Sequence, residues 1–178
     1  MRTLTIAIDT RVISSITSNY KTNNPKEAYD NFWESIIKEA LNRSINARII
    51  ITNSMIREHS SKLKIDKDAI ERNIIVIARK TKFGRVSVVI KGASKINSYK
   101  RKLEQRRKGI TEILKKKLKD KVDVDIAILA LNGVLDKIYT TDRALKYVIE
   151  RYSEEKIKIN THTVNKLSDI RILFEDDP

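Results

Sequence analysis

The sequence predicts an α/β fold: a doubly wound, mainly parallel sheet with helices on its faces. Two observations predict it. Short β-prone runs alternate along the chain with segments of helical periodicity, which implies right-handed crossovers within one sheet. The chain also has 178 residues, of which 40% are hydrophobic, and it contains no repeat or low-complexity linker. We therefore expect residues 1–178 to form a single domain with a substantial core.

The N-terminal part begins with a strand and continues with an amphipathic helix. Leu4–Ile8 is a β-prone run that ends at Asp9, as expected of a strand buried in a parallel sheet. Asn24 and Pro25 form an N-cap followed by proline at the first helical position. Behind them, apolar residues recur in adjacent pairs four residues apart, which predicts a helix with a buried aromatic stripe. These residues are Ala28, Tyr29, Phe32, Trp33, Ile36, Ile37, Ala40 and Leu41.

The middle of the chain contains further candidate strands and helices. Ala47–Thr52 is expected to be the second strand, and the helix after it carries Glu58. A third helix is expected over Lys67–Arg79. The valine-rich segment Arg85–Ile90 is either a third strand or a β-like excursion, because periodicity does not separate the two.

Between Lys91 and Lys121 basic residues dominate, and we expect a basic helical insertion over 91–121. Its apolar residues follow the three-four spacing of a narrow helical seam, and Gly109 is expected to bend or divide the helix. The seam residues are Ile96, Tyr99, Leu103, Ile110 and Ile113.

The C-terminal part begins with a very apolar helix over Asp123–Leu131, which Gly133 is expected to close. Lys137–Thr141 is predicted to be a strand, and Asp142 separates it from a helix over Arg143–Tyr152. Ile157–Ile159 and Ile170–Phe174 are candidates for the last strands, and the acidic end, Glu175–Pro178, is expected to fray.

Composition excludes several classes of site. The chain has no cysteine, which excludes a disulfide framework, a thiolate zinc site and a cysteine nucleophile. Its two histidines make a histidine-rich metal site a poor expectation. The N-terminus does not resemble a signal peptide and no segment is long and apolar enough to span a bilayer, so we expect a cytoplasmic protein with no membrane partner. The net charge of +14 favours a polyanionic partner such as a nucleic acid over the alternative of thermophile surface charge.

Five acidic residues form the candidate site, and two of them, Asp9 and Asp142, stand where a parallel sheet places its functional sites. Asp9 and Asp142 follow strands, Asp123 and Asp125 begin the buried helix, and Glu58 lies on the helix after the second strand. Each aspartate alone is more often a helix cap or a turn residue. Together, in a basic chain, they are typical of a site that holds Mg²⁺ or Mn²⁺ against a phosphodiester.

Four local patterns of this sequence, in this order, resemble a PIN-domain nuclease. They are Ile8-Asp9-Thr10, the segment Ser54–Glu58, the aspartate-led helix Asp123–Leu131, and the strand end Ile138–Asp142. The resemblance implies a PIN-like fold and a catalytic site in which Asp9, Glu58, Asp123 or Asp125, and Asp142 bind Mg²⁺ or Mn²⁺. It also places Thr141 near the metal or the phosphate. Asp123 fits the family spacing and Asp125 fits variants with a second acid, so both remain candidates.

The basic segment followed by Val122–Asp125 is similar to the small PIN-type protein-only RNase P family, formerly labelled RNA-ligase partner proteins. This resemblance implies removal of 5′ leaders from precursor tRNA and assembly into a homo-oligomer. Two departures are a short insertion and Arg143, where that family often has an acid. The alternatives are a toxin-type PIN ribonuclease with an antitoxin, and a non-catalytic RNA-binding module. The basic residues expected to contact the RNA backbone are Lys100, Arg101, Arg106, Arg107 and Lys108.

Overall fold

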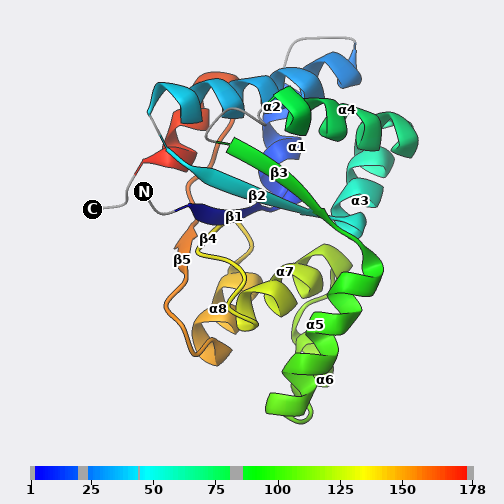
Figure 1. The fold of residues 1–178 in the computed structure, drawn as a ribbon, viewed down its shortest axis with the longest axis vertical. Helices are drawn as coiled ribbons and strands as arrows, with labels where there is room; N and C mark the ends of the chain where they lie inside the picture. The colour runs from blue at the N-terminus through cyan, green and yellow to red at the C-terminus, as the bar shows by residue number, and fades with distance from the viewer. Residues whose placement is uncertain (1–2, 20–23, 44, 81–85, 176–178) are drawn as a thin grey trace.

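The computed structural model describes residues 3–19, 24–43, 45–80 and 86–175, and its centre is a five-stranded, all-parallel sheet (Figure 1). The strand order is β3-β2-β1-β4-β5, so the chain winds outward from β1 in one direction and then in the other. The predicted doubly wound α/β architecture is therefore confirmed. The strands are β1 (Leu4–Ile8), β2 (Ala47–Thr52), β3 (Val86–Lys91), β4 (Lys137–Tyr139) and β5 (Lys158–Asn160).

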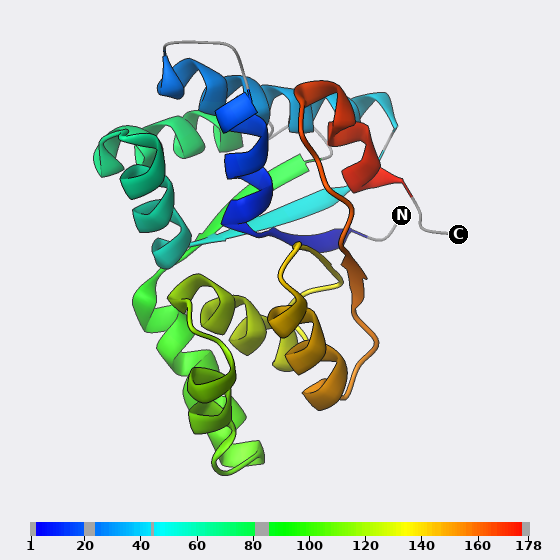
Figure 2. The same cartoon turned by 180° about the vertical axis from the view of Figure 1, so that it is seen from behind.

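Helices cover both faces of the sheet, as Figures 1 and 2 show from opposite sides. One layer contains α1 (Thr10–Asn19), α2 (Pro25–Asn42), α4 (Lys67–Lys80) and the 3₁₀ helix η1 (Leu167–Phe174). The other contains α5 (Ala93–Arg106), α6 (Ile110–Lys117), α7 (Lys121–Leu131) and α8 (Arg143–Tyr152). Helix α3 (Asn53–Leu63) follows β2 at the carboxyl end of the sheet and contacts both α1 and α7.

Local sequence signals explain several helix starts. The Asn24 side chain accepts a hydrogen bond from the Glu27 amide at 3.2 Å, with Pro25 at the first helical position of α2, as expected. The aromatic residues of the apolar stripe of α2, Tyr29, Phe32 and Trp33, are at most 1% exposed, whereas Leu41, at its C-terminal end, is 47% exposed because it lies in the last turn of the helix. Thr52 caps α3 and Asp120 caps α7 in the same way. Gly133, which follows α7, has a φ of 71°, in agreement with its predicted role as a helix terminator.

Two elements differ from the sequence-based expectation. The Thr10-Arg11 pair after Asp9 is typical of a turn that follows a strand, but the segment forms α1, whose Val12, Ile13 and Ile16 enter the core. Ile170–Phe174 was expected to be a strand, but it belongs to η1 and packs against α2. In both segments the apolar residues recur three or four positions apart, so tertiary packing rather than strand propensity decides the structure.

Smaller differences concern element ends. The strand expected over Lys137–Thr141 ends at Tyr139, and β3 runs from Val86 to Lys91. Arg85, at the expected start of that strand, lies outside the described residues, as do residues 176–178 of the acidic end that we expected to fray.

The basic segment forms two helices, α5 and α6, which Gly109 separates with a φ of 85°. Its apolar seam faces the chain's own core, since Leu103 and Ile110 are buried and α5 packs on α7. Among the described residues, no helix is long and apolar enough to cross a membrane.

Candidate active site

The acidic residues converge where the direction of winding reverses, between β1 and β4. The two strands pair in parallel with Ile8 opposite Tyr139, and the Asp9 amide donates to the Tyr139 carbonyl at 2.8 Å. This register places the residues after β1 beside those after β4. A doubly wound sheet forms its ligand-binding crevice at this point, outside the carboxyl ends of the strands.

Asp9 is held in place by a threonine from the neighbouring strand end. Asp9 is 2% exposed, and the Thr140 hydroxyl donates to its carboxylate at 2.8 Å. The same hydroxyl oxygen accepts from the Asp142 amide at 3.0 Å, so Thr140 joins the two predicted site residues. Burial raises the pKa of Asp9, while the Thr140 hydrogen bond and the charge of Arg11 act in the opposite direction.

Asp142 is both a helix cap and a member of the acidic site. One of its carboxylate oxygens accepts from the Leu145 amide at 3.0 Å and so caps α8. The other lies 2.9 Å from a guanidinium nitrogen of Arg11. The ordinary interpretation of this aspartate as a cap is therefore correct, and it does not exclude a role in a metal site.

Asp123 completes the group from α7. It is 4% exposed, and its pKa is raised to about 7, first by burial and then by the negative charges of Asp9, Asp142 and Asp120. The positive charge of Arg11 opposes this shift. Asp123 therefore lies within electrostatic reach of the aspartates at the ends of both β1 and β4.

Asp125 faces a different environment, although it is only two residues away on the same helix. Its carboxylate accepts from the Ser54 hydroxyl at 2.5 Å, and it lines a pocket between α3, α5 and α7. Burial raises the pKa of Asp125, whereas the Ser54 hydrogen bond and the charges of Lys121 and Lys100 lower it. Two residues along a helix correspond to a rotation of about 200°, which explains why neighbouring aspartates point to different surroundings.

Glu58 contributes a carboxylate from α3. One of its oxygens lies 2.6 Å from the Lys62 ammonium, and the other is buried without a hydrogen-bond partner among the described residues. Its charge contributes to the raised pKa of Asp9, so the two carboxylates are near each other. The buried hydroxyl oxygen of Thr10 also lacks a hydrogen-bond partner within the described part of the chain.

The chemistry of these residues fits a hard divalent cation. The donors are carboxylate and hydroxyl oxygens, which Mg²⁺ and Mn²⁺ prefer. A buried, unpartnered Glu58 oxygen and mutual repulsion around Asp123 are both features that a cation would relieve. Within the described ranges, however, no three acidic or imidazole side chains are arranged so that they could hold one ion as they stand. These side chains would have to move before three of them could hold one ion.

The predicted RNA-contacting residues divide into two groups. Arg101 and Lys108 are exposed, and Lys100 is half-buried beside Lys115 and Lys121. Arg106 is also exposed, but its guanidinium donates to the Leu131 carbonyl at 2.9 Å, and the half-buried Arg107 donates to the Tyr152 carbonyl. These two guanidinium groups thus connect the end of α5 to α7 and α8.

The structure also identifies site residues that we did not select from the sequence. Thr141, which we expected near the metal, has an exposed side chain, while the adjacent Thr140 contacts Asp9. Arg11 and Ser54 are the immediate partners of Asp142 and Asp125. For Arg11 and Thr140 the available signal was a position two residues from a predicted acid, but the sequence does not show which neighbour points inward.

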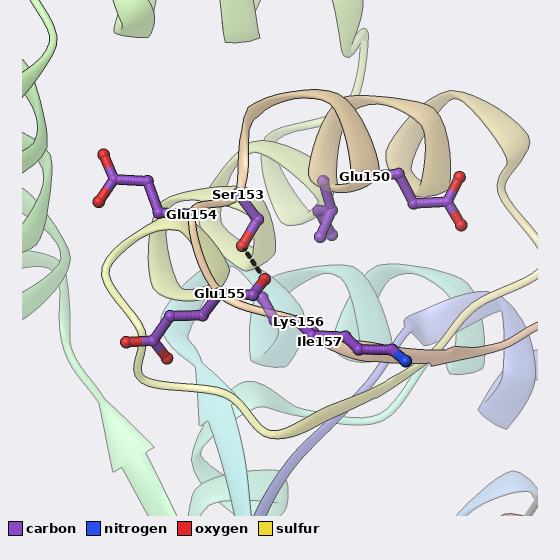
Figure 3. Close-up of a pocket in the computed structure, with 7 residues that line it drawn as sticks. Glu150, Ser153, Glu154, Glu155, Lys156 and Ile157 are labelled. Atoms are coloured by element: carbon purple, nitrogen blue, oxygen red, sulfur yellow. Dashed lines mark hydrogen bonds between the residues drawn. The ribbon is translucent and has the colours of Figure 1, made fainter.

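A second acidic region lies at the other end of α8 and has a different character. Figure 3 shows a pocket there, lined by Glu150, Glu154 and Glu155, whose carboxylates point in different directions. Glu150 pairs with Lys146 and Glu154 with Arg107. Because these carboxylates diverge and two of them already have cationic partners, this region is a poor candidate for a metal centre.

Comparison with known proteins identifies no relative of this chain. No family model matches the chain, and no curated protein or solved structure shows significant similarity to it.

Proposed function

We propose that this chain is a metal-dependent endoribonuclease of the PIN type that cleaves structured RNA. One observation carries the proposal. Asp9, Asp123 and Asp142 come from three separate elements and gather at the switch point of the sheet, where their charges and burial raise the pKa of Asp123 to about 7. Burying several carboxylates together is unfavourable unless a cation compensates them, and such arrangements are typical of functional sites.

Asp9, Asp123, Asp142 and Glu58 would hold Mg²⁺ or Mn²⁺. When bound, such an ion supplies a water of lowered pKa and neutralises charge on the phosphodiester. The chain's own residues keep the site in order. Thr140 orients the Asp9 carboxylate, and the α8 amide of Leu145 fixes one oxygen of Asp142. Arg11 holds the other oxygen of Asp142, and its charge also acts on Asp9 and Asp123.

The substrate class follows from charge and from the sequence resemblance. The net charge of +14 favours a polyanion, and the exposed basic residues Arg101 and Lys108 offer contacts to phosphates. We place precursor tRNA first among structured RNAs because the basic segment followed by Val122–Asp125 resembles the protein-only RNase P family. Homo-oligomer formation belongs to the same proposal, and it would have to use surfaces other than the buried seam residues Leu103 and Ile110.

The test is cleavage of three substrates, namely precursor tRNA, an unstructured messenger-like RNA and single-stranded DNA, with and without Mg²⁺ or Mn²⁺. We expect metal-dependent cleavage of the precursor tRNA. Cleavage of the messenger-like RNA alone would instead favour a toxin-type ribonuclease, and binding without cleavage would favour an RNA-binding module.

Two substitutions attribute the activity to the site. Asp9→Asn and Asp142→Asn should each abolish cleavage, because asparagine removes the charge. It can still accept the hydrogen bond from Thr140 or from the Leu145 amide, so the fold should persist. Asp66→Asn, at an exposed aspartate before α4, is the matched control and should cleave like the wild type. Wild-type turnover in Asp9→Asn would remove Asp9 from the site.

A further inference from the structure

A polar pocket of about 250 Å³ lies between α3, α5 and α7, beside the candidate active site. Asn53 and Arg57 reach it from α3, Asn97 from α5, and Lys121 and Asp125 from α7. The three helices meet near the carboxyl ends of β2 and β3, and in Figure 1 α3 rises above these ends while α5 and α7 lie below them. The volume is slightly below the roughly 300–1,000 Å³ of pockets that enclose a whole small molecule, so it suits one part of a larger ligand.

Positive charge lines this pocket from two helices that are separate in sequence, with Arg57 on α3 and Lys121 on α7. Arg57 and Lys121 are exposed, and neither forms an ion pair with another described residue. Lys100 lies one turn beyond Asn97 on α5. Its pKa is lowered by desolvation and by the nearby charges of Lys115 and Lys121. An anion bound between Arg57 and Lys121 would offset their charges, and a nucleic-acid phosphate is the anion that a chain of this charge would meet.

The Asp125 carboxylate in the pocket wall argues against a site for a bare anion. A site for inorganic phosphate alone would be weakened by a carboxylate in its wall, yet Asp125 lines this pocket and is fixed there by Ser54. The pocket therefore combines donors, on Arg57, Lys121 and the asparagine amides, with an acceptor. An RNA nucleotide has the complementary set, because its phosphate oxygens accept hydrogen bonds and its ribose 2′-hydroxyl can donate one.

We propose that this pocket binds one nucleotide of the RNA strand next to the bond that is cleaved. Arg57 and Lys121 hold its phosphate, and the Asp125 carboxylate accepts a hydrogen bond from its 2′-hydroxyl. The pocket would thereby distinguish RNA from DNA. This assignment rests on the proposed ribonuclease function and adds to it a subsite and a basis for sugar specificity.

The phosphate-binding role is tested by equilibrium binding in EDTA, where cleavage does not interfere. The probes are a fluorescent RNA hairpin with a 5′ single-stranded extension and a DNA of the same sequence. Arg57→Ala/Lys121→Ala should weaken binding of both probes and lower the slope of log affinity against log salt by roughly 0.7–0.9 for each phosphate that is no longer neutralised. Lys26→Ala/Lys156→Ala removes the same charge from two exposed lysines elsewhere and is the matched control. An effect no larger than that of this control would overturn the phosphate assignment.

The sugar-binding role is tested with Asp125→Ala. The wild type should prefer the RNA probe by about tenfold, as expected for one hydrogen bond to a charged group, and Asp125→Ala should lose this preference. Ser54→Ala, the matched control, removes the same internal hydrogen bond but keeps the carboxylate, so it should retain the preference. If Asp125→Ala does not fold, RNA hairpins with one 2′-deoxy nucleotide at successive positions test the wild type directly. Equal affinity at every position, or equal binding of RNA and DNA, would overturn the sugar assignment.

The two proposals fail in distinguishable ways. A wild-type protein that cleaves no RNA with Mg²⁺ or Mn²⁺ contradicts the nuclease, whereas the binding measurements in EDTA still assess the pocket. Conversely, a wild-type protein that cleaves RNA while the pocket variants bind like their controls contradicts the pocket alone.

Discussion

A guanidinium nitrogen of Arg11 lies 2.9 Å from the Asp142 carboxylate, so a positive charge of the chain itself is paired with the acidic site. Arg11 also lowers the pKa of Asp9 and of Asp123, against the larger effect of burial. Its side chain is 50% exposed, which leaves it free to move away when another cation binds. Arg11 and a metal ion would therefore compete for the same carboxylates.

This competition predicts that Arg11→Ala binds Mg²⁺ or Mn²⁺ more tightly than the wild type. An exposed ion pair contributes about 0.2–1 kcal/mol, which corresponds to a roughly one-and-a-half- to fivefold lower metal dissociation constant. Isothermal titration calorimetry measures it, with Arg151→Ala, an exposed arginine in the last turn of α8, as the control. Weaker metal binding in Arg11→Ala would contradict competition and indicate that Arg11 supports the site.

The different surroundings of Asp123 and Asp125 predict different metal titrations. Asp123→Asn should raise the metal concentration needed for half-maximal cleavage by at least about tenfold, because even outer partners of a metal site commonly contribute that much. Asp125→Asn should raise it much less, since Asp125 faces Ser54 and Lys121. The measurement is cleavage rate against metal concentration for each variant. The reverse order would make Asp125 the main ligand.

Asp123 also predicts a pH dependence of stability in the metal-free protein. Its pKa is about 7 when folded and 3.8 when unfolded, so the folded state binds the proton more tightly. The resulting stabilisation is complete below pH 3.8 and is lost as the pH rises through 7. In EDTA, the free energy of unfolding of the wild type should fall as the pH rises, with a slope of at most about 1.4 kcal/mol per pH unit. Asp123→Asn should not show this fall. Urea unfolding between about pH 4 and 8 measures it, and parallel curves for both proteins would refute the shift.

His59 predicts a pH dependence of stability that is opposite in sign to that of Asp123. It is buried on α3, one of its nitrogens is 2.9 Å from the Tyr29 hydroxyl, and burial lowers its pKa from 6.5 to about 3. The unfolded chain binds the proton more tightly, so the stability due to neutral His59 is present above pH 6.5 and is lost as the pH falls toward 3. His59→Asn can keep the bond to Tyr29 and should flatten the loss of stability below pH 6.5. Thermal unfolding at several pH values tests this, with exposed His162→Asn as the control.

The arginines at the end of α5 predict a change in stability. Arg106 donates to the last turn of α7 and Arg107 to the end of α8, so each alanine variant should lower the free energy of unfolding by about 1 kcal/mol. Arg101→Ala, on the exposed side of the same helix, should change it little. Chemical denaturation of the three variants tests the assignment. Full stability of Arg106→Ala would mean that its hydrogen bond to the Leu131 carbonyl contributes nothing measurable.

Signals that act within a few residues were sufficient to predict most of the fold. Two β-prone runs became β1 and β2, the valine-rich run that periodicity had left open became β3, and Asn24 with Pro25 began α2 where expected. Such signals are local because a cap or an apolar periodicity acts through the backbone of its own segment. The sequence alone also placed Asp9 and Asp142 directly after strands, where an open parallel sheet forms its sites, and the structure then showed that the two strands are neighbours.

Tertiary structure decided what local propensity could not. The first helix, Thr10–Asn19, is rich in serine, threonine and β-branched residues, which are weak helix formers, and it owes its stability to burial of Ile13 and Ile16. Ile170–Phe174 joined η1 because its apolar residues meet α2 rather than a sheet edge.

The details of the site likewise depended on contacts between distant segments. Only the β1–β4 register made Thr140, and not Thr141, the partner of Asp9, across 131 residues of sequence. Only the rotation of α7 against its neighbours turned Asp123 toward Asp9 and Asp142 while Asp125 met Ser54. The sequence by itself therefore determined which chemical groups gather at this end of the sheet. Packing determined which of them face one another, because that depends on the orientation of whole elements.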